Sequence, residues 1–259
     1  MAERIGRLGE VEFFTGRRRL NDATLVVTRF PLRGERSAPD FVLVHGLGVS
    51  SRTYGPTAAA LAALGDVYLI DLPGYGYSPR PEHDLGIAGH ARVLGQFLGS
   101  AGLDRPVVVG HSMGTQVVAQ LAADFPHLAE HIALIGPVIV PGARSLPKAA
   151  ALLLRDALRE PAWVTGMAVN DYLFRTGPRY LAQQLPHLIG ADLDAVAARV
   201  HAKTLVIAGE DDPIVPHGWA RDLAARFGNG RFATVPGPHV SMFSAPDRVA
   251  ALLDEHAKR

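Results

Sequence analysis

The sequence has no cysteine and no excess of charge of either sign. The absence of cysteine excludes disulfides, thiolate metal sites and a cysteine nucleophile. It is compatible with the cytoplasmic location that we expect. Twenty-six Lys and Arg residues stand against 25 Asp and Glu residues, a formal net charge of +1. Such a balance gives no electrostatic footprint for nucleic acid, so we expect no nucleic-acid partner.

Long apolar runs are also lacking. No uninterrupted stretch approaches the length of a membrane span, and the first ten residues lack the apolar core of a signal peptide. The 11 histidines show no spacing typical of metal ligands. We therefore expect no membrane partner, no metal and no cofactor. The remaining expectation is a monomer or homodimer that binds a small-molecule substrate.

Short apolar stretches, many of them rich in β-branched residues, alternate with helical stretches along most of the chain. Residues 1–24 predict short strands or an irregular lead-in, and Leu25–Phe30 predicts a strand. Six further strands are expected at Phe41–Val44, Val67–Ile70, Val107–Val109, Ile132–Ile135, Thr204–Ala208 and Arg231–Val235. Buried parallel strands need no polar alternation because both of their faces are covered. The pattern predicts an α/β fold with a mostly parallel central sheet and helices on both faces.

The alternation breaks near residue 136. From there to about Val200 the sequence is helical and apolar, with a clear helix predicted over Ala149–Arg159. We expect residues 1–136 and 201–259 to form one α/β core, and residues 137–200 to form an inserted helical cap. In open α/β sheets, ligands bind at the carboxyl edge, so the cap is expected to cover that edge.

The stretch 107–114, Val-Val-Val-Gly-His-Ser-Met-Gly, is the strongest functional signal. It reads as a buried strand followed by the pattern G-x-S-x-G and then by a helical run over 115–124. A sharp turn between strand and helix raises the serine side chain at the edge of the sheet. The helix N-terminus offers amide groups and a positive dipole end to a developing oxyanion.

Two more strand ends carry candidate catalytic groups. The strand at 204–208 runs into Gly-Glu-Asp-Asp at 209–212, and the strand at 231–235 runs into Pro-Gly-Pro-His at 236–239. A serine hydroxyl needs an imidazole to accept its proton, and the imidazole needs a carboxylate on its other nitrogen. The chain order Ser, Asp, His at strand ends supplies these three groups.

These motifs, together with His-Gly-Leu-Gly at 45–48 and Asp-Leu-Pro-Gly-Tyr-Gly-Tyr-Ser at 71–78, resemble those of α/β-hydrolase-fold enzymes. The resemblance extends from Phe41 to the C-terminal helix at Asp247–His256. It implies Ser112 as the nucleophile, His239 as the general base and Asp212 as the orienting acid, with Asp211 as the alternative acid. It also implies an oxyanion hole formed by the backbone N–H groups of Leu47 and Met113. His45 is expected to hold the oxyanion loop, and the 71–78 loop is expected to be structural.

The resemblance implies a serine hydrolase that cleaves a carboxylic ester, or a related lactone or thioester, of a small to medium apolar substrate. A serine nucleophile disfavours dehalogenase and epoxide hydrolase chemistry, which this family performs with a carboxylate. Three alternatives remain: a hydrolase of C–C bonds in meta-cleavage products, a perhydrolase or haloperoxidase-like activity, and a ligand receptor with low turnover. The large side chains expected to bind the substrate are Trp163, Met167, Tyr172 and Phe174.

Overall fold

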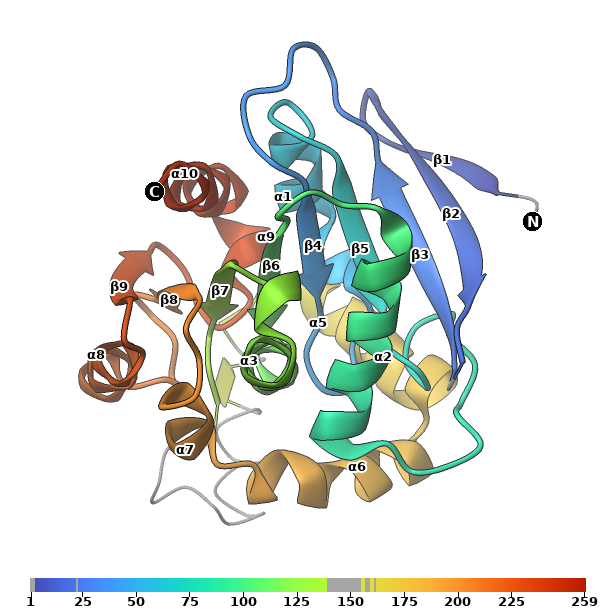
Figure 1. The fold of residues 1–259 in the computed structure, drawn as a ribbon. Helices are drawn as coiled ribbons and strands as arrows, with labels where there is room; N and C mark the ends of the chain where they lie inside the picture. The colour runs from blue at the N-terminus through green and yellow to red at the C-terminus, as the bar shows by residue number, and fades with distance from the viewer. Residues whose placement is uncertain (1–2, 22, 139–154, 157–158, 161) are drawn as a thin grey trace.

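A nine-stranded sheet runs through the computed structural model of the chain, which describes residues 3–21, 23–138, 155–156, 159–160 and 162–259 (Figure 1). The strand order is β1-β2-β3-β5-β4-β6-β7-β8-β9. The strands span Arg4–Leu8 (β1), Val11–Arg19 (β2), Thr24–Phe30 (β3), Phe41–Val44 (β4), Val67–Asp71 (β5), Val107–His111 (β6), His131–Ile135 (β7), Lys203–Gly209 (β8) and Gly230–Val235 (β9).

The sheet is parallel from β5 to β9 and antiparallel at its N-terminal edge. β4 pairs in parallel with both β5 and β6, and β7, β8 and β9 continue in the same direction. β1, β2 and β3 form antiparallel pairs, and β3 joins β5 in antiparallel register. The lead-in expected at residues 1–24 therefore consists of two strands that extend the sheet. The fold predicted from the sequence, a mostly parallel sheet flanked by helices, is confirmed.

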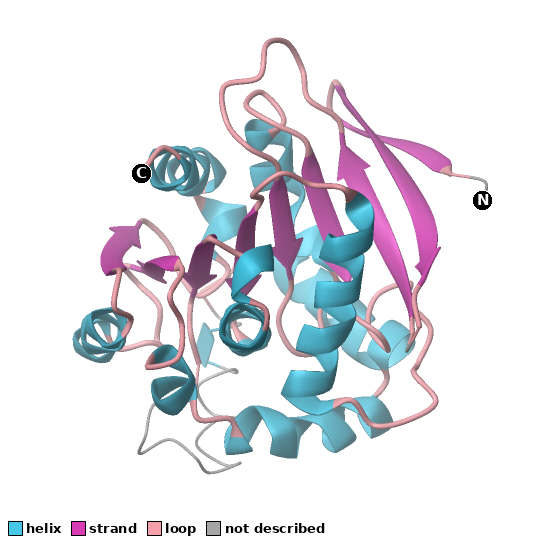
Figure 2. Cartoon of the chain, viewed as in Figure 1, coloured by secondary structure: helices cyan, strands magenta, loops and turns pink. Residues whose placement is uncertain are grey.

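Helices cover both faces of this sheet (Figure 2). Those of the core are α1 (Gly55–Leu61), α2 (Gly86–Ala101), α3 (Met113–Asp124), α8 (His217–Arg226), α9 (Ser241–Ser244) and α10 (Pro246–Ala257), with 3₁₀ turns η1 (Ser51–Tyr54) and η2 (Pro126–Leu128). Alternate residues of each strand enter different cores. Val42 and Val108 pack with α2, α3 and α8, whereas Leu43 and Val109 pack with α1 and α10. The central strands β4 and β6 are buried on both faces for this reason, which explains their continuous apolar sequences.

The region expected to form the cap is helical in the residues that the structure describes. It contains α5 (Ala162–Asn170), a π-helical turn η3 (Asp171–Thr176), α6 (Pro178–Gly190) and α7 (Leu193–Ala197). α6 lies below the carboxyl ends of the central strands (Figure 1). Most of the helix predicted over Ala149–Arg159 falls outside the described residues.

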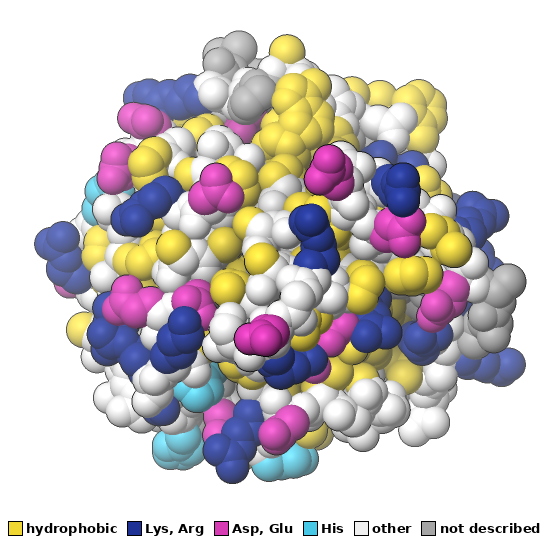
Figure 3. Space-filling view, turned by 90° about the horizontal axis from the view of Figure 1, so that it is seen from above, with side chains coloured by type: hydrophobic (Ala, Val, Ile, Leu, Met, Phe, Trp, Pro, Cys, Tyr) yellow, Lys and Arg dark blue, Asp and Glu magenta, His cyan; other side chains and the backbone are white. Residues whose placement is uncertain are grey.

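Charged side chains of both signs are interspersed over the face of the molecule seen in Figure 3, as the small net charge leads one to expect. Among the described residues, no helix is both long enough and apolar enough to cross a lipid bilayer.

Candidate active site

Ser112 occupies a strained turn between β6 and α3. Its backbone has φ 54° and ψ −120°, a conformation that residues with a side chain rarely adopt. The turn is closed by the two flanking glycines. A Cβ on Gly110 would lie 2.3 Å from the carbonyl oxygen of Gly114, and a Cβ on Gly114 would lie 2.5 Å from that of Val44. Only glycine fits these two positions, so the motif fixes the geometry that presents a half-buried Ser112 at the sheet edge.

Asp212 and His239 meet in a buried ion pair at the ends of β8 and β9. His239 Nδ1 lies 2.8 Å from Asp212 Oδ2, and the two side chains are 5% and 0% exposed. The other carboxylate oxygen of Asp212 accepts hydrogen bonds from the amides of Ile214 and Val215. Because Nδ1 donates its proton to the carboxylate, Nε2 is left as the acceptor. Among the described residues Nε2 has no hydrogen-bond partner.

The pKa of His239 is raised above the ordinary value of 6.5. Burial disfavours the imidazolium and lowers the pKa, but the Asp212 carboxylate, its hydrogen bond and two cap carboxylates outweigh that effect. A base of raised pKa is a stronger proton acceptor, provided that the pH keeps it neutral.

The end of β7 brings Ser112 and His239 to the same place. The Ser112 amide donates to the Ile135 carbonyl over 3.0 Å. One residue further on, a Cβ on Gly136 would lie 2.9 Å from His239 Cε1. The structure therefore gathers Ser112, Asp212 and His239 at one sheet edge. The alternative acid, Asp211, is exposed.

The two amides expected to bind an oxyanion flank Ser112. Met113 is the first residue of α3, where helical N–H groups have no partner within the helix. Leu47 follows Gly46, whose Cβ, if present, would lie 2.9 Å from Ser112 Cβ. Both amides thus belong to segments that border the serine.

His45 fixes the loop that carries Leu47. Its Nδ1 donates to the Gly46 carbonyl over 2.8 Å, and its Nε2 accepts from the Leu72 amide over 3.0 Å. This pair of contacts requires a neutral ring, and burial lowers the pKa of His45 accordingly. The role expected for His45, holding the loop, agrees with this geometry. The 71–78 loop is likewise tied down, since Asp71 accepts from the amides of Ser51 and Tyr77.

His111 contacts His239, the candidate general base. Its Nε2 donates to the His239 carbonyl over 3.1 Å, and the two rings lie 4.8 Å apart. Burial lowers the pKa of His111 well below 6.5, so the ring is neutral and its proton sits on Nε2.

The helical segment between β7 and β8, which corresponds to the expected cap, contacts the loop that carries Leu47 through Asp171, the first residue of η3. The fully buried carboxylate accepts hydrogen bonds from the Ser50 amide (3.0 Å) and the Ser50 hydroxyl (2.6 Å). It also forms ion pairs with Arg52 and with Arg175, the latter at 3.0 Å. Thr176 of the same turn donates to the Gly48 carbonyl. Single π-helical turns occur frequently at functional sites, and this one secures the loop that carries Leu47.

A second part of the cap touches the turn that carries His239. Asp156 accepts from the His239 amide over 3.1 Å, and Glu160 accepts from the Val240 amide over 2.8 Å. Arg159 donates to the carbonyl oxygen of Asp211, next to Asp212. No local feature of the sequence indicates these contacts, because each joins segments more than 50 residues apart.

The four residues expected to bind the substrate lie on α5 and η3. Tyr172 is half-buried, and its ring occupies the space beside Gly48. Trp163 packs edge-on against Phe243, with ring centroids 4.2 Å apart. Met167 is half-buried, and Phe174 is 78% exposed. The structure thus places Tyr172 beside the loop that carries Leu47, and Phe174 on the surface.

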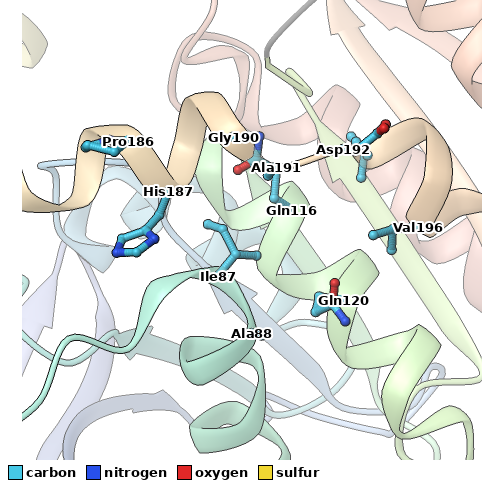
Figure 4. A pocket seen from close by; sticks show the side chains of 11 residues that line it. Ile87, Ala88, Gln116, Gln120, Pro186, His187, Gly190, Ala191, Asp192 and Val196 are labelled. Atoms are coloured by element: carbon cyan, nitrogen blue, oxygen red, sulfur yellow. The ribbon is translucent and has the colours of Figure 1, made fainter.

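Two cavities among the described residues lie away from Ser112. A cavity of about 340 Å³ lies between the helices α2, α3, α6 and α7 and is lined by residues of all four (Figure 4). Another cavity, of about 700 Å³, adjoins residues 79–85. Neither is lined by Ser112, Asp212 or His239.

Comparison with known sequences identifies the family. The sequence profile of the Alpha/beta hydrolase family matches residues 41–252. This chain belongs to the Alpha/beta hydrolase family.

Relatives of this alpha/beta hydrolase carry several names. It is 31% identical over 234 residues to a "Putative carbamate hydrolase RutD" of Pseudomonas savastanoi pv. phaseolicola, a match that covers 81% of this chain and 90% of the relative. It is 34% identical over 163 residues to an uncharacterized protein of Mycobacterium tuberculosis, covering 59% of this chain. The chain matches only 47% of the length of that mycobacterial relative.

The fold of this alpha/beta hydrolase also recurs in solved structures. The enol-lactonase from Burkholderia xenovorans LB400 superposes with a TM-score of 0.78 at 20% sequence identity, over 94% of this chain and 100% of the lactonase. At that identity the likeness shows the fold alone.

Proposed function

We propose that this alpha/beta hydrolase is a serine hydrolase that cleaves a carboxylic ester, lactone or thioester through an acyl-enzyme. The observation that carries the proposal is the buried 2.8 Å contact between His239 and Asp212, at the same sheet edge as the strained Ser112. Membership of the family supports hydrolysis as the reaction class. The apolar residues of α5 and η3 favour a mostly hydrophobic substrate.

In the proposed reaction Ser112 Oγ attacks the carbonyl carbon while His239 Nε2 takes the hydroxyl proton. The negative charge moves to the carbonyl oxygen, where the Leu47 and Met113 amides would bind it. The tetrahedral intermediate collapses, His239 returns the proton to the leaving alcohol oxygen, and the acyl group remains on Ser112. Water then attacks the acyl-enzyme with His239 again as the base, releasing the acid and regenerating Ser112.

Asp212 has two tasks in this scheme. Its hydrogen bond to Nδ1 keeps the imidazole in the tautomer whose Nε2 accepts a proton, and its charge stabilises the imidazolium. The amides of Ile214 and Val215 hold the carboxylate in place for both tasks.

The test is steady-state hydrolysis of p-nitrophenyl esters from acetate to a long acyl chain. We expect turnover to depend on chain length and to vanish in Ser112→Ala and His239→Ala. Asp212→Asn should lower kcat by about 10⁴-fold, because the wrong histidine tautomer is then favoured. Asp211→Asn is the matched control, since this adjacent carboxylate is exposed. Equal losses in the two asparagine variants would contradict the assignment of the acid.

A carbamate is the second substrate class to test, because a relative that is 31% identical bears the name of a carbamate hydrolase. The same nucleophile and oxyanion site would serve a carbamate carbonyl. A folded protein that hydrolyses carbamates but no ester would overturn the ester proposal. A folded protein that hydrolyses neither substrate class would favour the alternatives of C–C bond cleavage or ligand binding as a receptor.

A further inference from the structure

Two cap carboxylates are buried against the turn that carries His239. Asp156 and Glu160 are 6% and 8% exposed, and their carboxylates bind the consecutive amides of His239 and Val240. They reach this turn from 83 and 80 residues earlier in the chain. The amides of a largely buried turn need hydrogen-bond partners, and here two carboxylates from a distant segment of the chain supply them.

Neither carboxylate is paired with a cation in the part of the chain that the structure describes. Arg159 lies between them in sequence, yet its guanidinium donates to the Asp211 carbonyl. The second oxygen of Glu160 is buried without a hydrogen-bond partner among these residues. Burying carboxylates without a counter-ion costs folding free energy. A cost of this kind is common at functional sites, where strain and desolvation serve the chemistry.

We propose that Asp156 and Glu160 are positioning residues, which hold the His239–Val240 turn and place negative charge beside the catalytic imidazole. The inference rests on the proposed function of His239 as the general base. By fixing two consecutive amides, the carboxylates restrict the backbone from which the imidazole projects. The ring is then held against Asp212 on one nitrogen and is free to accept a proton on the other.

The charge acts on the same ring. Among the described residues, the titratable and charged groups around His239 are Asp212 at the end of β8, His111 at the end of β6, and Asp156 and Glu160 from the cap, with Arg159 bound to the loop beside Asp212. His111 is neutral, so the groups of this set that carry charge are the carboxyls and the guanidinium of Arg159. The imidazolium formed during each proton transfer is therefore stabilised by Asp212 and Asp156, and by Glu160 at a pH high enough to ionise that carboxyl, whose pKa burial raises to about 7.

The pH dependence follows from this arrangement. The base must be neutral at the start of the reaction, so kcat/KM falls as the pH drops through the raised pKa of His239. Removing the charge of Asp156 lowers that pKa and moves the acid limb of the profile to lower pH. Removing Glu160 has a smaller effect, because its carboxyl is largely protonated below about pH 7. A residue that only packs would leave the limb where it is.

The experiment compares charge removal with acceptor removal in the full chain. Asp156→Asn and Glu160→Gln each keep an oxygen that accepts from the amide but cannot carry negative charge. Asp156→Asn should therefore move the acid limb to lower pH, and Glu160→Gln should move it less, because the Glu160 carboxyl is largely protonated below about pH 7. In Asp156→Ala/Glu160→Ala the turn loses both acceptors, and kcat should fall about 10²-fold with little change in KM, as for a misplaced catalytic group. Glu210→Gln, which removes an exposed carboxylate near the same loop, is the matched control and should change neither quantity.

Histidine NMR provides a readout that needs no substrate. The imidazole resonance of His239, assigned by its loss in His239→Gln, should titrate at lower pH in Asp156→Asn/Glu160→Gln than in the unsubstituted protein. An unchanged titration and an unchanged acid limb would overturn the proposal. If the alanine variant fails to fold, the isosteric variants still decide. Should the protein hydrolyse no ester, the proposed function fails, but the titration continues to test the positioning role.

Discussion

The cap contacts the two sides of the candidate site in different ways. On the oxyanion side, Asp171 is fully buried, receives two hydrogen bonds from Ser50 and is neutralised by Arg52 and Arg175. On the histidine side, Asp156 and Glu160 accept one amide bond each and have no cation paired with them among the described residues. A balanced buried charge holds one fixed geometry over a wide pH range, whereas an unbalanced one responds to pH.

This difference suits the two requirements that the proposed reaction places on the inserted segment. In the proposed reaction the loop that carries Leu47 must present an amide at a fixed point, which favours rigidity. In the same reaction His239 must change its charge, which favours an environment that stabilises the charged form. The predictions below test this contrast, beginning with the largest expected effect.

Replacing Asp171 by Ala should destabilise the contact between the cap and the loop that carries Ser50. The Ser50 amide and hydroxyl lose their acceptor and two guanidiniums lose their partner, so we expect the free energy of unfolding to fall by about 3 kcal/mol. Urea denaturation measures this change. The control is Glu12→Ala, which removes an exposed ion pair with Arg7 and should cost less than about 1 kcal/mol. A loss in Asp171→Ala no larger than in the control would show that the two sides of the cap do not differ.

Replacing Gly48 by Ala should separate the same loop from the cap. The residue has φ +77°, and the new Cβ would lie 1.8 Å from Tyr172 Cε1, so the ring must move. The left-handed backbone alone costs about 1–2 kcal/mol. Gly102→Ala is the matched control, because its φ is +67° and nothing lies within 4 Å of the added Cβ.

Thermal denaturation and ester hydrolysis of these two glycine variants distinguish backbone strain from lost packing. We expect Gly48→Ala to be the less stable of the two and to be the only one that loses turnover. Equal stability and equal turnover would mean that Tyr172 does not support the oxyanion loop.

Replacing Glu160 by Gln should make the stability of the protein depend less on pH. Burial raises the pKa of Glu160 from 4.5 to about 7. A raised pKa means that the folded state prefers the protonated carboxyl, so the contribution of Glu160 to stability is fully present below pH 4.5 and is lost as the pH rises through about 7. The glutamine variant, which stays neutral, should therefore be more stable than the unsubstituted protein above pH 7, by about 1 kcal/mol or 2–4 °C in Tm.

Thermal melts between pH 4.5 and pH 9 check this sign. The two proteins should melt together at the acid end and diverge toward the alkaline end. A glutamine variant that is less stable at pH 9 would contradict the unbalanced charge on the histidine side.

The sequence predicts that the candidate residues lie close together because each belongs to a short local motif. Buried valines mark the strand before Ser112, the glycines at 110 and 114 mark the turn, and the motifs at 209–212 and 236–239 follow two further strands. The resemblance to the family, and not the chain order, favoured Asp212 over Asp211. Parallel strands share one carboxyl edge, so three short motifs are enough to predict that these residues lie near one another.

The contacts of the cap were beyond such reasoning. Asp171 binds Ser50 across 121 residues, and nothing in the local pattern distinguishes it from the other carboxylates of the chain. The only available signal was an acidic residue inside an otherwise apolar helical stretch. Strands were one of the two structures expected over residues 1–24. The sequence did not decide between strands and an irregular lead-in, because β1 is largely exposed and lacks the apolar alternation that reveals a strand.

The position of the cap in the chain also affects how the protein folds and how it can change. The cap is inserted between β7 and β8, whose pairing of His131 with Lys203 closes the loop that contains it. Closing a flexible loop costs only about 0.6 kcal/mol more for each doubling of its length. The sheet is therefore almost indifferent to how long the inserted segment is. Insertions and deletions at this junction should therefore cost the sheet little stability, provided that they spare Asp156, Glu160 and Asp171, which bind the loops of the candidate site.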